Sequence, residues 1–442
     1  MTAARRVDRW RANWTVDVKT TRSTVRLFVK VPRLPSAVTS RSVMLSTYGT
    51  RREAAALRVL RDTAVDAPRV FGFHEPSGSV LVECLEGSGY LLSEPYEARR
   101  TLMGQYARQL AALHGLTDSA IATDELHAPG HTPGTPGPLA AALRDYEAVK
   151  AKVAGPDPLV DIALRWLRQH APADGTTRML HGDAGPNQFM FRGDELIATV
   201  DWEISHLGDP MSDIGYTRFR ESLYPTGTFE HFIGAYRGAG GHPIDRQKVD
   251  YFTVAAALVL LLGVARDVYA PRADNAEAIQ RLWWDAVARM AICEVLCSDI
   301  QMPPVHQVGG SEVSALASLL CQRLEQRAAT AGVDRNDAAL AKALASALDL
   351  RLDTAAAVDA AELLGTHIGD GPTATRQRLH ELAGGSEHQV TTALRYFGRR
   401  AAARLESLSP LAAADTWDIH EHHSEITGRA SPVVPSLPSI CK

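Results

Sequence analysis

The 442-residue chain lacks the features that would place it in several functional classes. Its formal net charge is −4, so it has no basic field to attract nucleic acid or an anionic membrane. Among its 5 cysteines, Cys293 and Cys297 form a close pair whose helical spacing is typical of buried core thiols rather than metal ligands. The longest apolar run, residues 252–265, is shorter than a membrane span and predicts a buried helix.

The N-terminus also lacks the apolar core of a secretion signal, because residues 1–6 lead into polar sequence. Hydrophobic residues make up 45% of the chain and charged residues 22%, which is typical of a globular protein. A chain of this length is expected to form two or three domains. These observations predict a cytoplasmic protein without nucleic-acid or membrane partners.

Two aspartates frame the most informative segment of the chain. Asp183 ends a His-Gly-Asp motif that begins at His181, and Asp201 stands eighteen residues further on. Residues 188–191 and 196–200 are strand-like runs separated by a turn signal, so we expect a β-hairpin that brings the two carboxylates together. Adjacent carboxylates repel each other, and a metal cation would relieve that repulsion. Phosphoryl transfer needs this arrangement, with one Asp for the proton of the acceptor and one for Mg²⁺ on the nucleotide.

This segment resembles the catalytic core of the aminoglycoside phosphotransferase and choline kinase family of small-molecule kinases. In that family an Asn follows five residues after the Asp of the motif, and the hairpin ends in a metal-binding Asp. Here Gln188 stands at the Asn position, directly after Asn187. Residues 205–213 also resemble the family, which often reads Leu-Gly-Asp-Pro there. The resemblance implies an α+β, bilobal protein-kinase-like fold with a small β-rich N-lobe and a large helical C-lobe.

Residues 1–90 have the pattern of the N-lobe. Strand-like runs and one helical run are found there, at residues 14–19, 24–31, 70–73 and 79–85 for the strands and 50–61 for the helix. By order and spacing, the resemblance assigns Lys30 to the nucleotide phosphates and Glu53 to the orientation of that lysine.

A hinge between the lobes is expected directly after the last of these strands. Glu83, Cys84 and Leu85 resemble the hinge of the family, whose backbone would hydrogen-bond adenine.

The N-lobe lacks the glycine-containing hairpin that normally covers the phosphates. Residues 9–14 and 20–24 contain no glycine, and close backbone approach is harder with side chains in the way. Hydroxyl groups together with Arg22 would have to make the phosphate contacts instead. We also expect the first strand of this lobe to be short or absent.

The remainder of the chain is predicted to be helical outside the catalytic segment. Residues 91–300 are expected to form the C-lobe with the acceptor pocket, and the Pro- and Gly-rich residues 301–311 a linker. Residues 312–410 repeat Leu and Ala at helical spacing. This pattern predicts an all-α bundle, which resembles a helical domain fused to some members of this kinase family. Residues 411–442 are expected to be a disordered tail.

The resemblance implies a role for each residue of the site. Asp183 would accept or orient the proton of the acceptor hydroxyl, His181 would brace the loop, and Asp201 would bind Mg²⁺. Gln188 offers an amide oxygen like that of Asn, but its side chain is one methylene longer and Mg²⁺ tolerates little geometric error. The metal site is therefore displaced, weakened or served by Asn187.

We predict an ATP- and Mg²⁺-dependent phosphotransferase that acts on a hydroxyl of a small molecule. The segment and its helical companion favour the branch that resembles the kinase portion of acyl-CoA dehydrogenase fusions, which acts on hydroxyacyl-CoA. The alternatives are an aminoglycoside-type antibiotic kinase and a degenerate kinase that binds nucleotide or a partner without catalysis. Gln188 and the glycine-free hairpins favour the degenerate kinase, whereas Asp183 and Asp201 oppose it. The helical domain is expected to bind a second copy or a partner protein.

Overall fold

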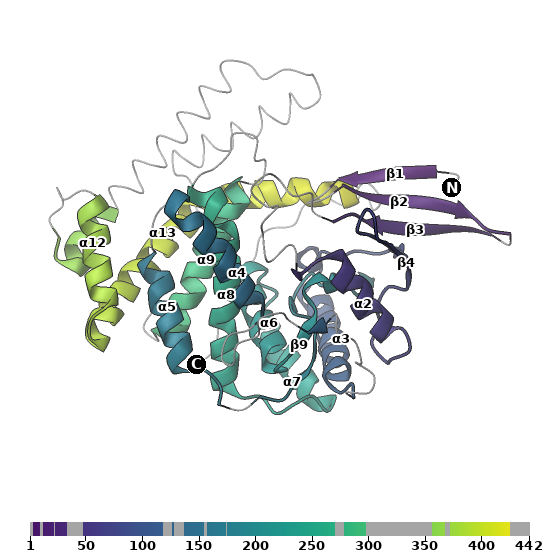
Figure 1. Cartoon of the computed structure of the whole chain (residues 1–442), viewed down its shortest axis with the longest axis horizontal. Coiled ribbons are helices and arrows are strands. Elements are labelled where there is room, and N and C mark those ends of the chain that lie inside the picture. Colours follow the sequence, from purple (N-terminus) through teal and green to yellow (C-terminus); the bar gives the residue numbers. More distant parts are fainter. Residues whose placement is uncertain are drawn as a thin grey trace, which may run out of the picture. The chain divides into compact units, whose positions relative to one another are not determined.

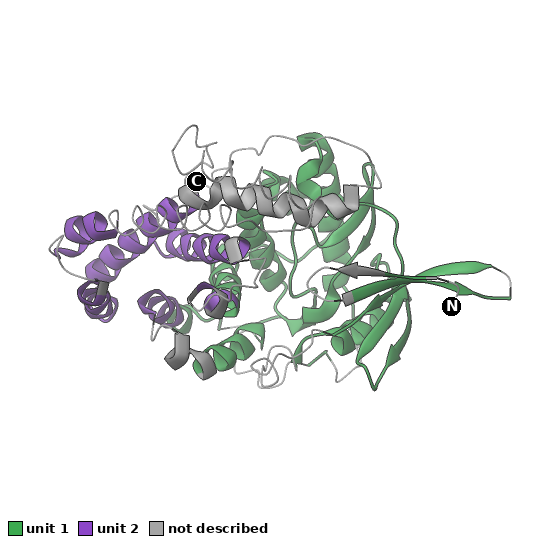
Figure 2. Ribbon diagram, turned by 90° about the horizontal axis from the view of Figure 1, so that it is seen from above, with its two compact units in different colours: residues 1–149, 167–263 green, residues 150–166, 264–442 purple. Residues whose placement is uncertain are grey.

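The structure, a computed structural model, divides into two compact units (Figure 2). The first unit comprises Met1–Val149 and Leu167–Gly263, and the second comprises Lys150–Trp166 and Val264–Lys442. The residues that the structure describes are 3–8, 12–21, 23–32, 47–117, 126–127, 137–153, 157–173, 175–269, 278–297, 356–366 and 372–424.

A five-stranded antiparallel sheet begins the first unit (Figure 1). Its strand order is β1-β2-β3-β5-β4, and the strands are β1 (Ala3–Asp8), β2 (Ala12–Lys19), β3 (Thr24–Lys30), β4 (Val70–His74) and β5 (Ser79–Glu83). The first strand was expected to be short or absent, but it is six residues long and pairs with β2 over its whole length. Its own composition is a weak strand signal, so the pairing partner defines it.

The hairpin between β2 and β3 turns without glycine. The hydroxyl of Thr20 donates to the carbonyl of Ser23 at 2.8 Å and accepts from the Ser23 amide at 3.0 Å. The Thr20 amide also donates to the Ser23 carbonyl at 2.7 Å. A side-chain hydroxyl therefore satisfies the backbone in this turn, as Ser and Thr side chains commonly do. The connection between β1 and β2, residues 9–11, lies outside the described residues.

The helix α2 (Thr50–Leu60) packs against β4 and β5, as the helical pattern at 50–61 predicted. Its small and apolar residues, among them Ala54, Leu57 and Leu60, are buried. Because Glu53 lies on the same buried part of the helix, its carboxylate is held inside the unit rather than in solvent.

The catalytic segment forms two short antiparallel ladders in the first unit. The strands β7 (Phe189–Arg192) and β8 (Glu195–Thr199) make the predicted hairpin, with Phe189 opposite Thr199. On either side of it, β6 (Arg178–Leu180) pairs with β9 (His206–Gly208), and the 3₁₀ turn η5 (Trp202–Ile204) leads from β8 to β9.

The other described helices of the first unit are α3 (Tyr96–His114), α6 (Met211–Leu223), α7 (Phe229–Gly238) and most of α4 (Gly137–Val153) and α8 (Arg246–Tyr269), with the 3₁₀ turn η2 (Leu91–Ser93) before α3. The helix α3 packs along α7 and contacts β6 and β8. The fold is therefore the predicted α+β arrangement of a small sheet and a larger helical part.

The helix α8 contains the apolar run noted in the sequence. Within the described residues, Arg246–Ala265 is long and apolar enough to cross a membrane by length and composition alone. Of its most apolar window, 72% is buried inside the protein, as in the core helix of a globular protein.

The second unit is helical where it is described. It contains α5 (Pro158–Gln169) in part, α9 (Ala278–Leu296), a helical stretch at 356–364, α12 (Pro372–Ala383) and α13 (Glu387–Ser424). The prediction placed residues up to 300 in the C-lobe, but residues 264–297 belong to the second unit, because α9 packs extensively against α13.

The predicted tail begins inside α13. Residues 411–424 were expected to be disordered but are helical, and Pro410 lies within the same helix. The Leu-Ala-Ala-Ala run at 411–414 consists of strong helix formers, which explains the continuation. The linker at 301–311, residues 312–355 of the predicted bundle and residues 425–442 lie outside the described residues.

Candidate active site

The hairpin places Asp183 and Asp201 within electrostatic range of each other. Burial raises the pKa of Asp183, the Arg220 guanidinium opposes that rise, and the negative charge of Asp201 adds to it. Beyond β8, the backbone of the hairpin is extended by a hydrogen bond of 2.9 Å from the Val200 amide to the Gln188 carbonyl. Asp201 itself has a left-handed backbone with φ of 71°, which is uncommon outside glycine and marks a constrained position.

Lys30, at the end of β3, joins Asp201 to the helix α2. Its Nζ lies 2.6 Å from Glu53 Oε1 and 2.9 Å from Asp201 Oδ1. The side chain of Glu53 is 4% exposed, whereas that of Asp201 is 40% exposed and remains accessible. The structure therefore brings together the lysine and the glutamate that order and spacing singled out, and it adds the second aspartate of the hairpin to the pair.

Asp183 is held from two sides. Nη1 of Arg220, on α6, donates to Oδ1 at 2.9 Å and to Oδ2 at 3.0 Å. The side-chain amide nitrogen of Gln188 also donates to Oδ2. The side chain of Asp183 is 24% exposed and is therefore not sealed off from solvent. Arg220 was not predicted, because no sequence rule links a helix residue to a loop 37 positions earlier.

Gln188 and Asn187 point to different partners. The Asn187 amide oxygen accepts a hydrogen bond of 2.9 Å from the Leu91 amide, and its φ of 68° is left-handed. Gln188 is buried and turns its amide nitrogen to Asp183, which leaves its amide oxygen as the group that could ligate a cation. Of the two residues proposed for the metal, Gln188 is the one that lies beside Asp183.

His181 is buried and bonded within the loop. Its Nε2–H donates to the Val200 carbonyl at 2.9 Å, and its Nδ1 accepts from the Asp183 amide at 3.4 Å. The ring packs on Trp202, with centroids 4.6 Å apart. These contacts tie the start of the loop to the end of the hairpin, and they fit the bracing role that the resemblance implies.

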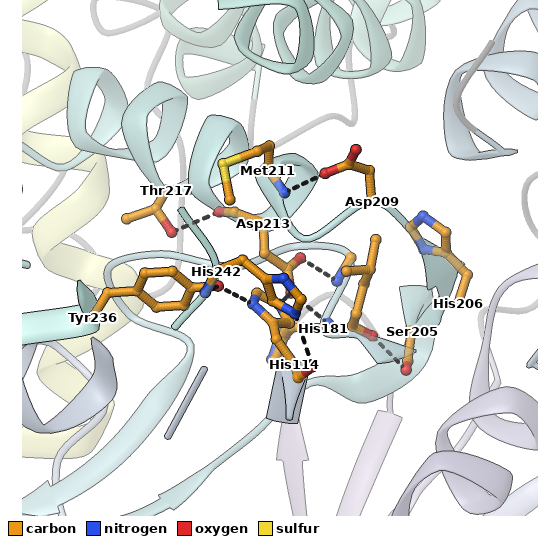
Figure 3. Close-up of polar contacts among 12 residues, drawn as sticks. His114, His181, Ser205, His206, Asp209, Met211, Asp213, Thr217, Tyr236 and His242 are labelled. Atoms are coloured by element: carbon orange, nitrogen blue, oxygen red, sulfur yellow. Dashed lines mark hydrogen bonds and ion pairs between the residues drawn. The ribbon is translucent and has the colours of Figure 1, made fainter. Parts of the chain in front are cut away.

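A buried acid from α6 holds the loop backbone (Figure 3). Asp213 accepts hydrogen bonds from the amides of His181 at 2.8 Å and Gly182 at 2.9 Å. His114, at the end of α3, donates to the same carboxylate from Nε2 at 3.1 Å, and Tyr236 on α7 lies 2.8 Å from its Nδ1. Burial would raise the pKa of Asp213, but the hydrogen bond and charge of His114, followed by those of the loop, hold it below its usual range.

Gly182 is required by the same loop. Its φ is +85°, and a Cβ at this position would run into the Ile204 carbonyl and lie 3.0 Å from the His206 ring. The middle residue of the His-Gly-Asp motif is thus fixed by close backbone approach, which the motif alone did not explain.

The predicted hinge begins at Glu83, the last residue of β5, and continues with Cys84 and Leu85. The amide of Glu83, the last residue of β5, donates to the Arg69 carbonyl at 2.8 Å. Cys84 and Leu85 continue from it, and Ser88 then exchanges backbone hydrogen bonds of 2.9 and 2.8 Å with Phe191 on β7. Burial raises the pKa of the Cys84 thiol, so it is not an activated nucleophile. This segment connects the sheet to the hairpin, and its contact with adenine stays a prediction.

The donor set fits a nucleotide-bound Mg²⁺ better than a metal held by protein alone. Across the described residues no group of three or more His, Cys, Asp or Glu side chains could hold a metal ion. One accessible carboxylate, Asp201, and one amide oxygen, Gln188, are the hard ligands that Mg²⁺ takes when phosphates and water complete its shell.

The fold and the placement of these residues define a small-molecule kinase. A sequence model of the phosphotransferase enzyme family matches residues 5–252, which is more than half of the chain. The chain therefore belongs to that family.

Individual relatives are more distant. Acyl-CoA dehydrogenase family member 10 of Mus musculus is 26% identical over 192 residues, and an Arabidopsis thaliana protein named as an acyl-CoA dehydrogenase is 26% identical over 193 residues. Each match covers 40% of this chain, but the chain spans 17% and 23% of the length of these two relatives. A solved structure from Ralstonia eutropha, assigned to the aminoglycoside phosphotransferases, is 19% identical with a TM-score of 0.51, and the match covers 66% of this chain and 92% of that chain. At this identity the likeness supports the fold alone.

Proposed function

We propose that this protein is a cytoplasmic, ATP- and Mg²⁺-dependent kinase that phosphorylates a hydroxyl of a small molecule. The observation that carries the proposal is the convergence of Lys30, Glu53 and Asp201 next to the aspartate of the His-Gly-Asp loop. A lysine, two carboxylates and an orienting glutamate are the groups that phosphoryl transfer from a nucleotide uses.

Each side chain has a defined task in this proposal. Lys30, oriented by Glu53, holds the nucleotide phosphates, and Asp201 and Gln188 hold Mg²⁺. The bound cation supplies charge neutralisation on the phosphate oxygens. Asp183 accepts the proton of the acceptor hydroxyl while the new oxygen–phosphorus bond forms and the bond to the leaving ADP breaks.

The leading acceptor class is a hydroxyacyl-CoA. Its support is the match to two relatives named as acyl-CoA dehydrogenases, each over somewhat more than 190 residues at 26% identity. An aminoglycoside is the alternative acceptor, on the likeness in fold to a structure assigned to the aminoglycoside phosphotransferases. The helical second unit is proposed to bind a second copy or a partner protein.

The test is transfer of phosphate from Mg·ATP to a panel of hydroxyacyl-CoAs, aminoglycosides and choline. The transfer is measured by the release of ADP and by the mass of the product. We expect a thermal shift with Mg·ATP and turnover of a hydroxyacyl-CoA. Asp183→Asn should lower kcat on the order of 1000-fold and leave ADP affinity unchanged. Absence of any nucleotide-dependent shift would overturn the kinase proposal, and turnover of aminoglycosides alone would replace the acceptor.

A nucleotide-binding protein without catalysis is the second function to separate. Gln188 in place of Asn and the donors crowded around Asp183 favour it. A clear shift with Mg·ATP but no ADP release on any acceptor, in wild type and Asp183→Asn alike, would select this function.

A further inference from the structure

Arg220 lies on α6, outside the catalytic loop, and bonds two residues of that loop. Its Nη1 donates to both oxygens of Asp183, while Nε and Nη2 donate to the Pro186 carbonyl at 3.2 and 3.0 Å. A guanidinium has five N–H donors in a fixed plane, and these contacts involve all three of its nitrogens. Because the plane is rigid, fixing one edge on Pro186 also fixes the orientation of the Asp183 carboxylate.

The loop is shaped to admit this side chain. Gly185 has φ of +142°, and a Cβ there would lie 2.8 Å from Cβ and 2.9 Å from Cδ of Arg220. Any other residue at Gly185 would displace the arginine stem or the helix α6. The glycine two residues after Asp183 is therefore matched to an arginine from another element.

General anchoring of the loop does not need Arg220. The Gly185 amide already donates to the Tyr106 hydroxyl at 3.1 Å, and Asp213 holds the amides at the start of the loop. What Arg220 adds is contact with both oxygens of the reactive carboxylate. Arg218, two residues earlier on α6, instead pairs with Asp250 on α8 and is an ordinary structural ion pair.

We propose that Arg220 is a positioning residue for phosphoryl transfer, which fixes the orientation of the Asp183 carboxylate toward the acceptor hydroxyl. The inference rests on the proposed function, because it requires Asp183 to act as the base. All three nitrogens of the Arg220 guanidinium are engaged within the protein, so Arg220 is not proposed to recognise the acceptor.

The test compares Arg220→Met and Arg220→Lys with Arg218→Met as the matched control on the same helix. The substrate is the member of the hydroxyacyl-CoA, aminoglycoside and choline panel that the wild-type protein phosphorylates. A misplaced base should lower kcat of Arg220→Met on the order of 100-fold, with acceptor KM and ADP Kd within about threefold of wild type. Lys keeps a positive charge beside Asp183 but lacks the rigid planar group that also bonds Pro186, so Arg220→Lys should recover about tenfold of that loss. Arg218→Met should keep wild-type kcat.

Gly185→Ala provides a second route to the same displacement if Arg220→Met does not fold. It keeps the arginine and should lower kcat while ADP Kd stays unchanged. A kcat near wild type in folded Arg220→Met, or equal losses in the Arg220 and Arg218 variants, would overturn the positioning role and leave the kinase proposal intact. Wild-type protein that transfers phosphate to no member of the panel would overturn both.

Discussion

We expect the side chain at Gln188 to determine the Mg²⁺ concentration that activity needs. Its side-chain amide nitrogen bonds Asp183, so its amide oxygen points away from that bond. A shorter side chain at this position would withdraw from Asp183 and present its oxygen closer to the backbone of the hairpin.

We expect Gln188→Asn to use Mg²⁺ at an equal or lower concentration than the wild-type protein. The same variant should lose several-fold in kcat, because the bond to Asp183 is lost while the one from Arg220 remains, on the order of 1 kcal/mol in the barrier. Magnesium titrations of turnover measure both effects. A large rise in the Mg²⁺ concentration needed for activity would mean that the site is built around the longer side chain.

Lys30 is expected to stabilise the fold in addition to its proposed role in nucleotide binding. Glu53 is almost fully buried, and its second oxygen, Oε2, has no hydrogen-bond partner among the described residues. Removing the lysine would leave that carboxylate charge without its direct partner, which is costly in a buried site.

We therefore expect Lys30→Met to lower the free energy of unfolding by about 3 kcal/mol and to weaken ADP binding. The double variant Lys30→Met with Glu53→Gln should regain much of the stability but none of the ADP affinity. Urea unfolding and calorimetric titration with ADP separate the two effects. If Lys30→Met were as stable as the wild-type protein, solvent rather than Lys30 would be stabilising the carboxylate charge of Glu53.

At the scale of elements, two helices hold the loop of residues 181–188. The helix α6 supplies Asp213 and Arg220, and α3 supplies His114 and Tyr106. The strand β6 and the hairpin β7–β8 enter the loop from both ends. The loop is thus fixed by elements far apart in the chain, and acid should loosen it by protonating Asp213.

Asp213→Asn tests this support and its pH dependence. The asparagine can accept from one loop amide but must turn a donor to the other, so we expect a loss of about 3 kcal/mol at neutral pH. Because the folded pKa of Asp213 lies below its usual value, its contribution is present above about pH 4 and is lost as the pH falls through the folded value. Urea unfolding of both proteins from neutral to acidic pH should show the gap closing. A gap that persists at the lowest pH would mean that the carboxylate charge does not matter.

Elements whose sequence signals are local could be predicted, whereas elements that depend on contacts with other parts of the chain could not. The hairpin and α2 were predicted from turn residues and apolar periodicity, which act over a few positions. The strand β1 was missed because its stability comes from pairing with β2. The same reason applies within the site, since Asp183 and Asp201 flank one predicted hairpin, whereas Arg220 and Asp213 reach the loop from α6 through tertiary packing that leaves no spacing in the sequence.

At the scale of the whole molecule, the residues of the proposed chemistry belong to the first unit, and the second unit has its own ionic centre. Asp285 on α9 is fully buried and accepts from Arg289 at 3.0 Å and from Arg404 on α13 at 2.8 Å. Arg289 continues to Asp157, at the start of α5, at 2.6 Å. This chain of charges joins three helices of the second unit.

Asp285→Ala should therefore weaken the second unit without affecting nucleotide binding. Loss of the buried acceptor leaves two guanidinium groups partly unpaired, and we expect the free energy of unfolding to fall by about 3 kcal/mol. Glu362→Ala is the matched control, because its ion pair with Arg399 is exposed on both sides and should be worth roughly 0 to 1 kcal/mol. Urea unfolding measures the first effect, and ADP titration of the folded variant should give a Kd within roughly twofold of wild type, because the residues proposed to bind nucleotide belong to the first unit. A Kd that rises in parallel with the loss of stability would show that the helical unit is coupled to the nucleotide site.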